Sequence, residues 1–136
     1  MDKNDPLNIS KGKDSRKFRR LRVNLSVIYR IDRPSSVRML IGNREIRATM
    51  LDLSEGGLSL LTNYNIPVQS VLLLKFTLFK VENDDVSFYG PMSIDADVRY
   101  NIPLGGDEYR VGVRFIKIKN QDKFEIANFI KYAPLH

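Results

Sequence analysis

Two short stretches of this sequence hold residue types that could bind a ligand with phosphates and purine bases. The first is "RKFRR", residues 16–20, where Arg16, Arg19 and Arg20 fall within five positions. A guanidinium fork matches the oxygens of a phosphate and the O6 and N7 acceptors of guanine. A run of solvated surface charge that binds no ligand is the simpler alternative, and the segment alone fits both interpretations.

The second stretch is "DLSEGG", residues 52–57, which stands between two segments with strand patterns. The Asp52 carboxylate could accept hydrogen bonds from the N–H groups on guanine's Watson–Crick edge, with the Ser54 hydroxyl beside it. Gly57 has no side chain, so a flat base could approach the backbone there. The alternative is a turn without a ligand, because aspartate, serine and glycine are also the residues that tight turns favour.

The positive charge of the chain is concentrated around the first stretch. The sequence has 22 basic and 16 acidic residues, a net charge of +6. Residues 11–22 hold seven of the basic residues and one acid, so that segment nets +6 and the remaining 15 basic and 15 acidic residues cancel. A neutral body with one basic segment is suited to a compact anionic partner.

Composition argues against several other classes of protein. The 136 residues suggest one domain, and the lack of cysteine excludes disulfide and thiolate metal sites and is typical of a reducing, cytoplasmic setting. No apolar segment is long enough to span a membrane. The only histidine is His136, and Asp95 and Asp97 share one strand face where solvent exposure is the ordinary interpretation. We therefore expect no catalytic residue, no metal and no enzymatic activity.

Hydrophobic periodicity predicts a mostly β protein. Alternating apolar residues indicate strands near residues 23–31, 45–54, 57–62, 71–79, 93–100 and 109–118, with turns such as "DRPSS", residues 32–36, between them. Helical spacing begins near Asn120, which we expect to cap a terminal α-helix. The pattern predicts a mobile tail over 1–15 and a domain over 16–136, a six-stranded antiparallel β-barrel with a C-terminal α-helix.

The two stretches together resemble the signature of the PilZ domain family. That signature is RxxxR followed, after one strand and a turn, by [D/N]xSxxG, and here it is matched by Arg16 to Arg20 and by Asp52 to Gly57. "LRVNLSVIYRI" is similar to the family's first strand and "YRVGVRFIKI" to its last long strand. The resemblance covers about residues 15–132. It implies a receptor for the bacterial second messenger cyclic di-GMP.

The resemblance also implies roles for individual residues. Those in the first motif, with the basic segment at 16–22, would wrap the ligand, and those in the second would recognise guanine from the barrel surface. The residues implied are Arg16, Arg20 and, as a helper, Arg19, then Asp52, Ser54 and Gly57. The alternating pattern of the last strand places Gly112 and Arg114 on one face, and either could also line the site. Ser15 precedes the first arginine, which favours one ligand molecule per site over an intercalated pair.

The function predicted from the sequence is a cyclic di-GMP receptor or adaptor without catalysis. Ligand binding would change the conformation of the basic N-terminal segment, and an unidentified downstream protein would detect the change. Two alternatives stay open: a small nucleic-acid-binding barrel, and an interaction module with no ligand. We regard nucleic acid as the less favoured partner because the positive charge is confined to one segment and does not follow a groove.

Overall fold

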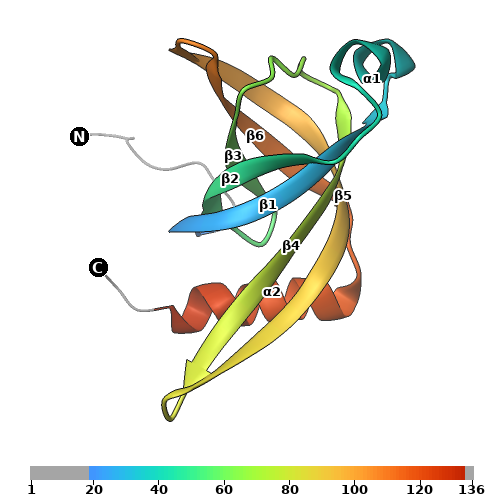
Figure 1. Cartoon of the computed structure of the whole chain (residues 1–136). Coiled ribbons are helices and arrows are strands. Elements are labelled where there is room, and N and C mark those ends of the chain that lie inside the picture. Colours follow the sequence, from blue (N-terminus) through green and yellow to red (C-terminus); the bar gives the residue numbers. More distant parts are fainter. Residues whose placement is uncertain (1–18, 134–136) are drawn as a thin grey trace, which may run out of the picture.

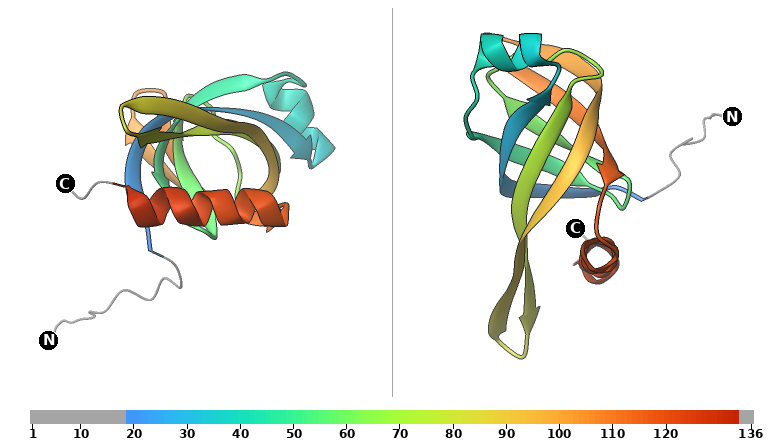
Figure 2. Two further views of the ribbon diagram at one scale, coloured as in Figure 1. Left: turned by 90° about the horizontal axis from the view of Figure 1, so that it is seen from below. Right: turned by 90° about the vertical axis from the view of Figure 1, so that its right-hand side faces the viewer.

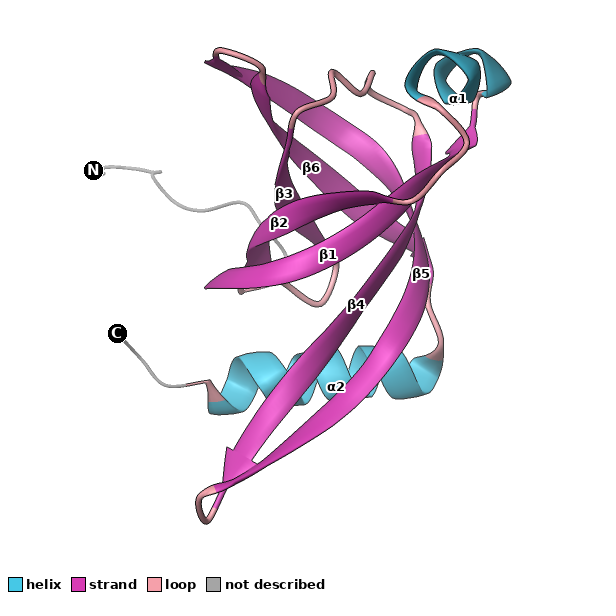
Figure 3. Cartoon of the chain, in the orientation of Figure 1, coloured by secondary structure: helices cyan, strands magenta, loops and turns pink. Residues whose placement is uncertain are grey.

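The computed structural model describes residues 19–133, and the N-terminal segment 1–18, including Arg16, and residues 134–136 lie outside the described part. Residues 19–133 form six strands and two helices (Figure 1; Figure 3). The strands are β1 (Leu21–Arg33), β2 (Ile46–Leu53), β3 (Gly57–Thr62), β4 (Val71–Glu82), β5 (Asp85–Gly105) and β6 (Glu108–Lys117), and the helices are α1 (Ser35–Ile41) and α2 (Asn120–Tyr132).

All strand pairs are antiparallel, and the sheet closes on itself. The order around the barrel is β1-β2-β3-β6-β5-β4, and β4 returns to pair with β1. Register places Asp52 opposite Ser59 of β3, and Ser59 opposite Gly112 of β6. Gly112 in turn lies opposite Tyr100 of β5. One row of residues therefore crosses four strands, although its members are far apart in the sequence.

The interior of the barrel is filled by the apolar residues that alternate along the strands. Tyr29, Met50, Leu60, Leu72 and Leu74 are fully buried. The Tyr29 hydroxyl lies 2.7 Å from Thr62 Oγ1, and burial raises the pKa of Tyr29 to about 12 because the phenolate would lose its hydration. The predicted six-stranded barrel and its apolar face are confirmed.

Helix α2 lies across one end of the barrel, alongside a hairpin that β4 and β5 extend beyond it (Figure 1; Figure 2). Ile126 and Ile130 of α2 are buried in the core cluster, and buried Asp122 accepts a hydrogen bond of 2.8 Å from the Tyr89 hydroxyl. Neither α1 nor α2 is long and apolar enough to cross a membrane. The terminal helix is confirmed, but Asn120 does not cap it: Lys119 occupies the N-cap position, without a side-chain cap bond.

The connection between β1 and β2 differs from the prediction. "DRPSS" was expected to be a turn, whereas β1 runs through Arg33 and residues 35–41 form α1. This helix has seven residues and only Val37 is buried, so its amphipathic pattern is too short to appear in the sequence.

Strand β5 is also longer than its alternating segment predicts. The pattern is clear at residues 93–100, yet the strand begins at Asp85 and ends at Gly105. Its first part pairs only with β4, and most of its residues are exposed on both faces. Pairing in this hairpin therefore continues where burial, the source of the alternating pattern, has stopped.

Candidate ligand site

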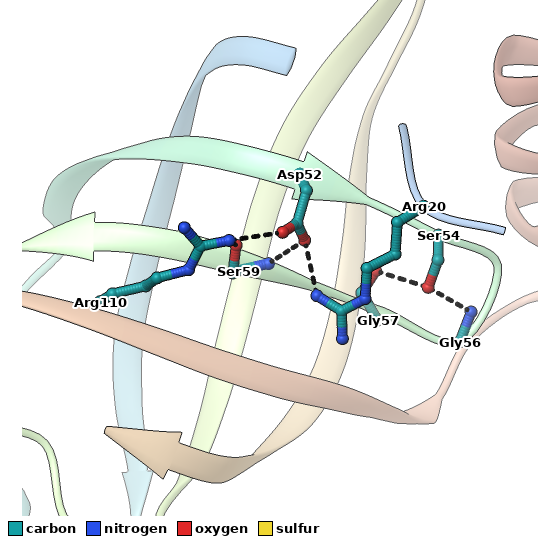
Figure 4. Close-up of polar contacts among 7 residues, drawn as sticks. All are labelled: Arg20, Asp52, Ser54, Gly56, Gly57, Ser59 and Arg110. Carbon is teal, nitrogen blue, oxygen red and sulfur yellow. Dashed lines mark hydrogen bonds and ion pairs between the residues drawn. The ribbon is translucent and has the colours of Figure 1, made fainter. Parts of the chain in front are cut away.

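A buried carboxylate on β2 forms the centre of the site (Figure 4). Asp52 is the penultimate residue of β2 and is only 6% exposed. Its Oδ1 accepts hydrogen bonds from Arg20 Nη1 at 3.1 Å and from the Ser59 backbone N–H at 3.1 Å. Its Oδ2 accepts from Arg110 Nη2 at 2.8 Å. A buried charge needs such partners, and here two guanidinium groups and one amide supply them.

Contact between Arg20 and Asp52 joins the two sequence motifs. Arg20 stands one residue before β1, and Asp52 follows 32 positions later on the neighbouring strand. Asp52 is bonded to β3 and β6 as well, so the carboxylate ties four parts of the chain together. The structure thus brings one residue of each motif together, and their shared role in ligand binding stays a prediction.

Arg110 was not among the residues expected from the sequence. Besides its bond to Asp52, its Nη2 lies 3.3 Å from Ser59 Oγ. The pKa of the Arg110 guanidinium is raised, chiefly by a hydrogen bond to the Tyr100 side chain and less by the charge of Asp52, while partial burial opposes the rise. The alternation of "YRVGVRFIKI" puts Arg110 on the face of Gly112 and Arg114, but only strand register brings it to Asp52.

Ser54 serves the turn in this structure. Its backbone N–H donates to the Gly57 carbonyl at 2.8 Å, and its hydroxyl donates to the same carbonyl at 3.2 Å. The hydroxyl also accepts from the Gly56 N–H at 3.2 Å. These contacts are those of the turn interpretation. Recognition of guanine by Ser54 stays a prediction, in which the hydroxyl would accept a further hydrogen bond through its second lone pair.

Gly57 and Gly112 both lie where another group leaves no room for a side chain. A Cβ on Gly57 would stand 2.1 Å from the Val113 carbonyl oxygen, which belongs to the backbone of β6. A Cβ on Gly112 would stand 2.0 Å from the ring of Tyr100. Close packing within the barrel therefore accounts for both glycines, and the approach of a base at Gly57 stays a prediction.

The other two described candidates do not contact Asp52. Arg114 is exposed on β6, two residues after Gly112. It donates a hydrogen bond to Asp97 Oδ2 at 3.0 Å. Arg19 donates to the carbonyl of Ile130 in α2 at 3.3 Å. Of the predicted arginines within residues 19–133, only Arg20 is therefore bonded to the carboxylate.

The candidate site has a buried centre, Asp52 and Ser59, and two partly exposed arginines, since the side chains of Arg20 and Arg110 are 30% and 39% exposed. Two hollows of about 230 and 370 Å³ occur on the barrel, the first beside Tyr29 and Lys75 and the second beside Val37 and Val68. None of the seven residues in Figure 4 lines either of them. A ligand at Asp52 would therefore lie outside these two hollows.

The PilZ domain family model matches residues 14–132, nearly the whole chain. This chain belongs to the PilZ domain family. The match includes both motifs, every described strand and the whole of α2. No curated protein has a sequence close enough to match.

Solved structures with the same fold include several PilZ proteins. The inhibitor of motility MotI/DgrA of Bacillus subtilis is 16% identical, with a TM-score of 0.61 over 85% of this chain and 49% of that one. YcgR of Escherichia coli in complex with c-di-GMP is 14% identical, with a TM-score of 0.55 over 86% and 45% of the two chains. The PilZ chain thus spans about half the length of these two proteins.

A third neighbour bears on the choice of partner. The MrkH–c-di-GMP complex of K. pneumonia is 15% identical, with a TM-score of 0.58 over 87% of this chain and 52% of that one. MrkH is also described as a c-di-GMP-dependent transcription regulatory factor. The expectation that nucleic acid is the less favoured partner gains no support from this neighbour.

Proposed function

We propose that this PilZ domain is a receptor for cyclic di-GMP. The observation that supports the proposal most strongly is the meeting of Arg20 and Asp52, one residue from each motif, at a distance of 3.1 Å. The same carboxylate is bonded to Arg110, whose side chain is 39% exposed. Three of the structural neighbours are described as complexes with c-di-GMP, which supports the same ligand here.

In this proposal the two halves of the site have different tasks. Asp52 accepts hydrogen bonds from guanine N–H groups, while Arg20 and Arg16 bind phosphate and the O6/N7 edge of the base. Arg16 lies outside the described residues, and its role follows from the motif. The ligand has two phosphate charges, and residues 11–22 offer a net charge of +6. Ser15 favours one ligand molecule per site.

The proposed output is a change in what the N-terminal segment presents to another molecule. Arg20 stands directly before the barrel, so rearrangement of its side chain on ligand binding would reposition residues 16–20 while the strands stay fixed. We propose that a downstream protein detects this change. A nucleic-acid partner is the second candidate, because MrkH, a protein of the same fold, is described as a transcription regulatory factor.

Calorimetric titration tests the proposed function. Cyclic di-GMP should bind the wild type with micromolar or tighter affinity and a stoichiometry of one, and Arg20→Ala and Asp52→Ala should abolish measurable binding. Arg99→Gln is the matched control, since Arg99 is an exposed arginine that lies 4.0 Å from a different carboxylate. No heat from the wild type would overturn the receptor proposal. A short single-stranded DNA that bound as tightly as the nucleotide would favour the second candidate.

A further inference from the structure

Arg110 lies in neither family motif, yet it makes the shortest contact to the Asp52 carboxylate, 2.8 Å from Oδ2. It extends from the middle of the barrel wall, because β6 is paired with β3 on one side and β5 on the other. Its Nη2 also lies 3.3 Å from Ser59 Oγ. Arg110 is thus held by two residues, one on β2 and one on β3.

Arg20 holds the same carboxylate less firmly. It makes one hydrogen bond to Oδ1, at 3.1 Å, and its Nε is buried without a hydrogen-bond partner among residues 19–133. It precedes Leu21, the first residue of β1, so no ladder hydrogen bonds hold its backbone in the sheet. The two guanidinium groups on Asp52 therefore differ in how easily each can be displaced.

The acceptor positions on the Asp52 carboxylate determine whether guanine can bind there without displacing Arg20. A carboxylate offers about four lone-pair positions, two on each oxygen. Here Arg20 and the Ser59 N–H occupy those of Oδ1, and Arg110 occupies one on Oδ2. Guanine presents two N–H donors side by side, which need one position on each oxygen. Among residues 19–133 no donor occupies the second position on Oδ2, but the position on Oδ1 becomes open only when Arg20 leaves.

From this geometry we propose that guanine replaces Arg20 on Asp52 while Arg110 stays in place, which makes Arg110 the residue that positions the carboxylate for base recognition. The inference rests on the proposed cyclic di-GMP receptor function. Arg110 and the Ser59 N–H hold the plane of the carboxylate fixed during the exchange. The released Arg20 guanidinium is then free to bind the phosphate or the O6/N7 edge of the same ligand.

The exchange also explains how ligand binding at Asp52 would reach the N-terminal segment. As long as Arg20 is bonded to Asp52, the residue before β1 is attached to the barrel wall. When guanine replaces Arg20 on Asp52, the Arg20 side chain would bind the ligand and no longer the barrel wall. Guanine binding at Asp52 would thus release the residue that precedes β1, which belongs to the RxxxR motif.

The first test compares two cyclic dinucleotides. Adenine has only one donor group on its Watson–Crick edge and an acceptor at N1, so it cannot bond to both oxygens of Asp52. We expect Arg110→Gln to weaken cyclic di-GMP binding on the order of tenfold, the usual effect of losing a hydrogen bond to a charged group. Weak binding of cyclic di-AMP should change little, so discrimination between the two should fall. Arg110→Lys should restore part of it.

Thermal unfolding and Arg99→Gln are the controls for this test. A loss of discrimination in Arg110→Gln, with unfolding close to that of Arg99→Gln, supports a positioning role, because a purely structural role would not alter the choice of base. Wild-type binding that is unchanged by Arg110→Gln overturns this inference but leaves the receptor proposal intact. A wild type that does not bind cyclic di-GMP overturns the receptor proposal itself.

The second test follows the exchange directly by side-chain NMR of the arginine guanidinium groups. Arg20→Lys and Arg110→Lys assign the two sets of signals in the ligand-free protein. On addition of cyclic di-GMP, the Arg20 signals should shift strongly, while those of Arg110 should keep the pattern of a carboxylate-bound guanidinium. Movement of the Arg110 signals with those of Arg20 unchanged would overturn the proposed order of exchange.

Discussion

Strand β6 carries two arginines that each face an aspartate, and the two pairs differ in what surrounds the carboxylate. Arg110 and Asp52 lie 2.8 Å apart, and Arg114 and Asp97 lie 3.0 Å apart. The side chain of Asp52 is 8% exposed and has three donors, whereas that of Asp97 is 20% exposed and its Oδ1 has no hydrogen-bond partner within residues 19–133. Similar distances therefore conceal different energetics, because burial and the number of donors set the cost of breaking each pair.

Substitution of the glycines beside the two pairs should change the free energy of unfolding most. Gly57 lies opposite Arg114, and Gly112 lies in the row of Asp52. Gly57→Ala should lower the free energy of unfolding by about 3 kcal/mol, because its Cβ would meet a backbone carbonyl that cannot move alone. Gly112→Ala should cost about 1 kcal/mol, because the end of the Tyr100 side chain can swing away. Urea unfolding measures both, and equal losses would contradict the assigned packing.

Removal of each carboxylate compares the pairs themselves. Asp52→Ala should cost about 2 kcal/mol of unfolding free energy, because the Ser59 N–H is left buried without an acceptor and two arginines lose their partner. Asp97→Ala should cost less than about 1 kcal/mol, as is usual for an exposed ion pair. Urea unfolding of the two variants measures both losses of unfolding free energy. A larger loss for Asp97→Ala than for Asp52→Ala would contradict the prediction.

The sequence predicted Asp52 as a site residue but did not predict its partner Arg110. The motifs pointed to Asp52 and Arg20 because both lie in patterns of local spacing. Arg110 could not be connected to Asp52 in the same way, because the connection depends on which residues of β2, β3 and β6 stand opposite one another. The alternating pattern of each strand fixes which face is buried, but it does not by itself say which residues of neighbouring strands stand opposite one another.

The fold shows the same limit. Strands with one buried face were predictable from alternating apolar residues, as in β1 and β4. The first part of β5 and the seven residues of α1 bury too little to leave a pattern. The sequence likewise indicated that Gly57 was needed, but the close backbone of β6 that explains it appears only in three dimensions.

The smallest effect that we expect is that of salt on the stability differences between these variants and the wild type. Between about 0.1 M and about 1 M salt, the screening length falls from about 10 Å to about 3 Å. The stability difference between Asp97→Ala and the wild type should shrink toward zero over this range, since that pair is exposed to solvent. The difference for Asp52→Ala should persist, because much of it arises from a buried hydrogen bond. Urea unfolding at both salt concentrations measures this, and loss of both differences would mean that Asp52 is as accessible as Asp97.

A titration of cyclic di-GMP into Asp52→Leu and Asp97→Leu beside the wild type tests the central claim most directly. Both substitutions keep a side chain of similar size and remove the two acceptor oxygens and the negative charge. Our account predicts that the wild type and Asp97→Leu bind alike, and that Asp52→Leu is weaker by on the order of tenfold or more, because no acceptor remains for the guanine N–H groups. Equal binding by all three proteins, or an equal loss in both variants, would contradict it.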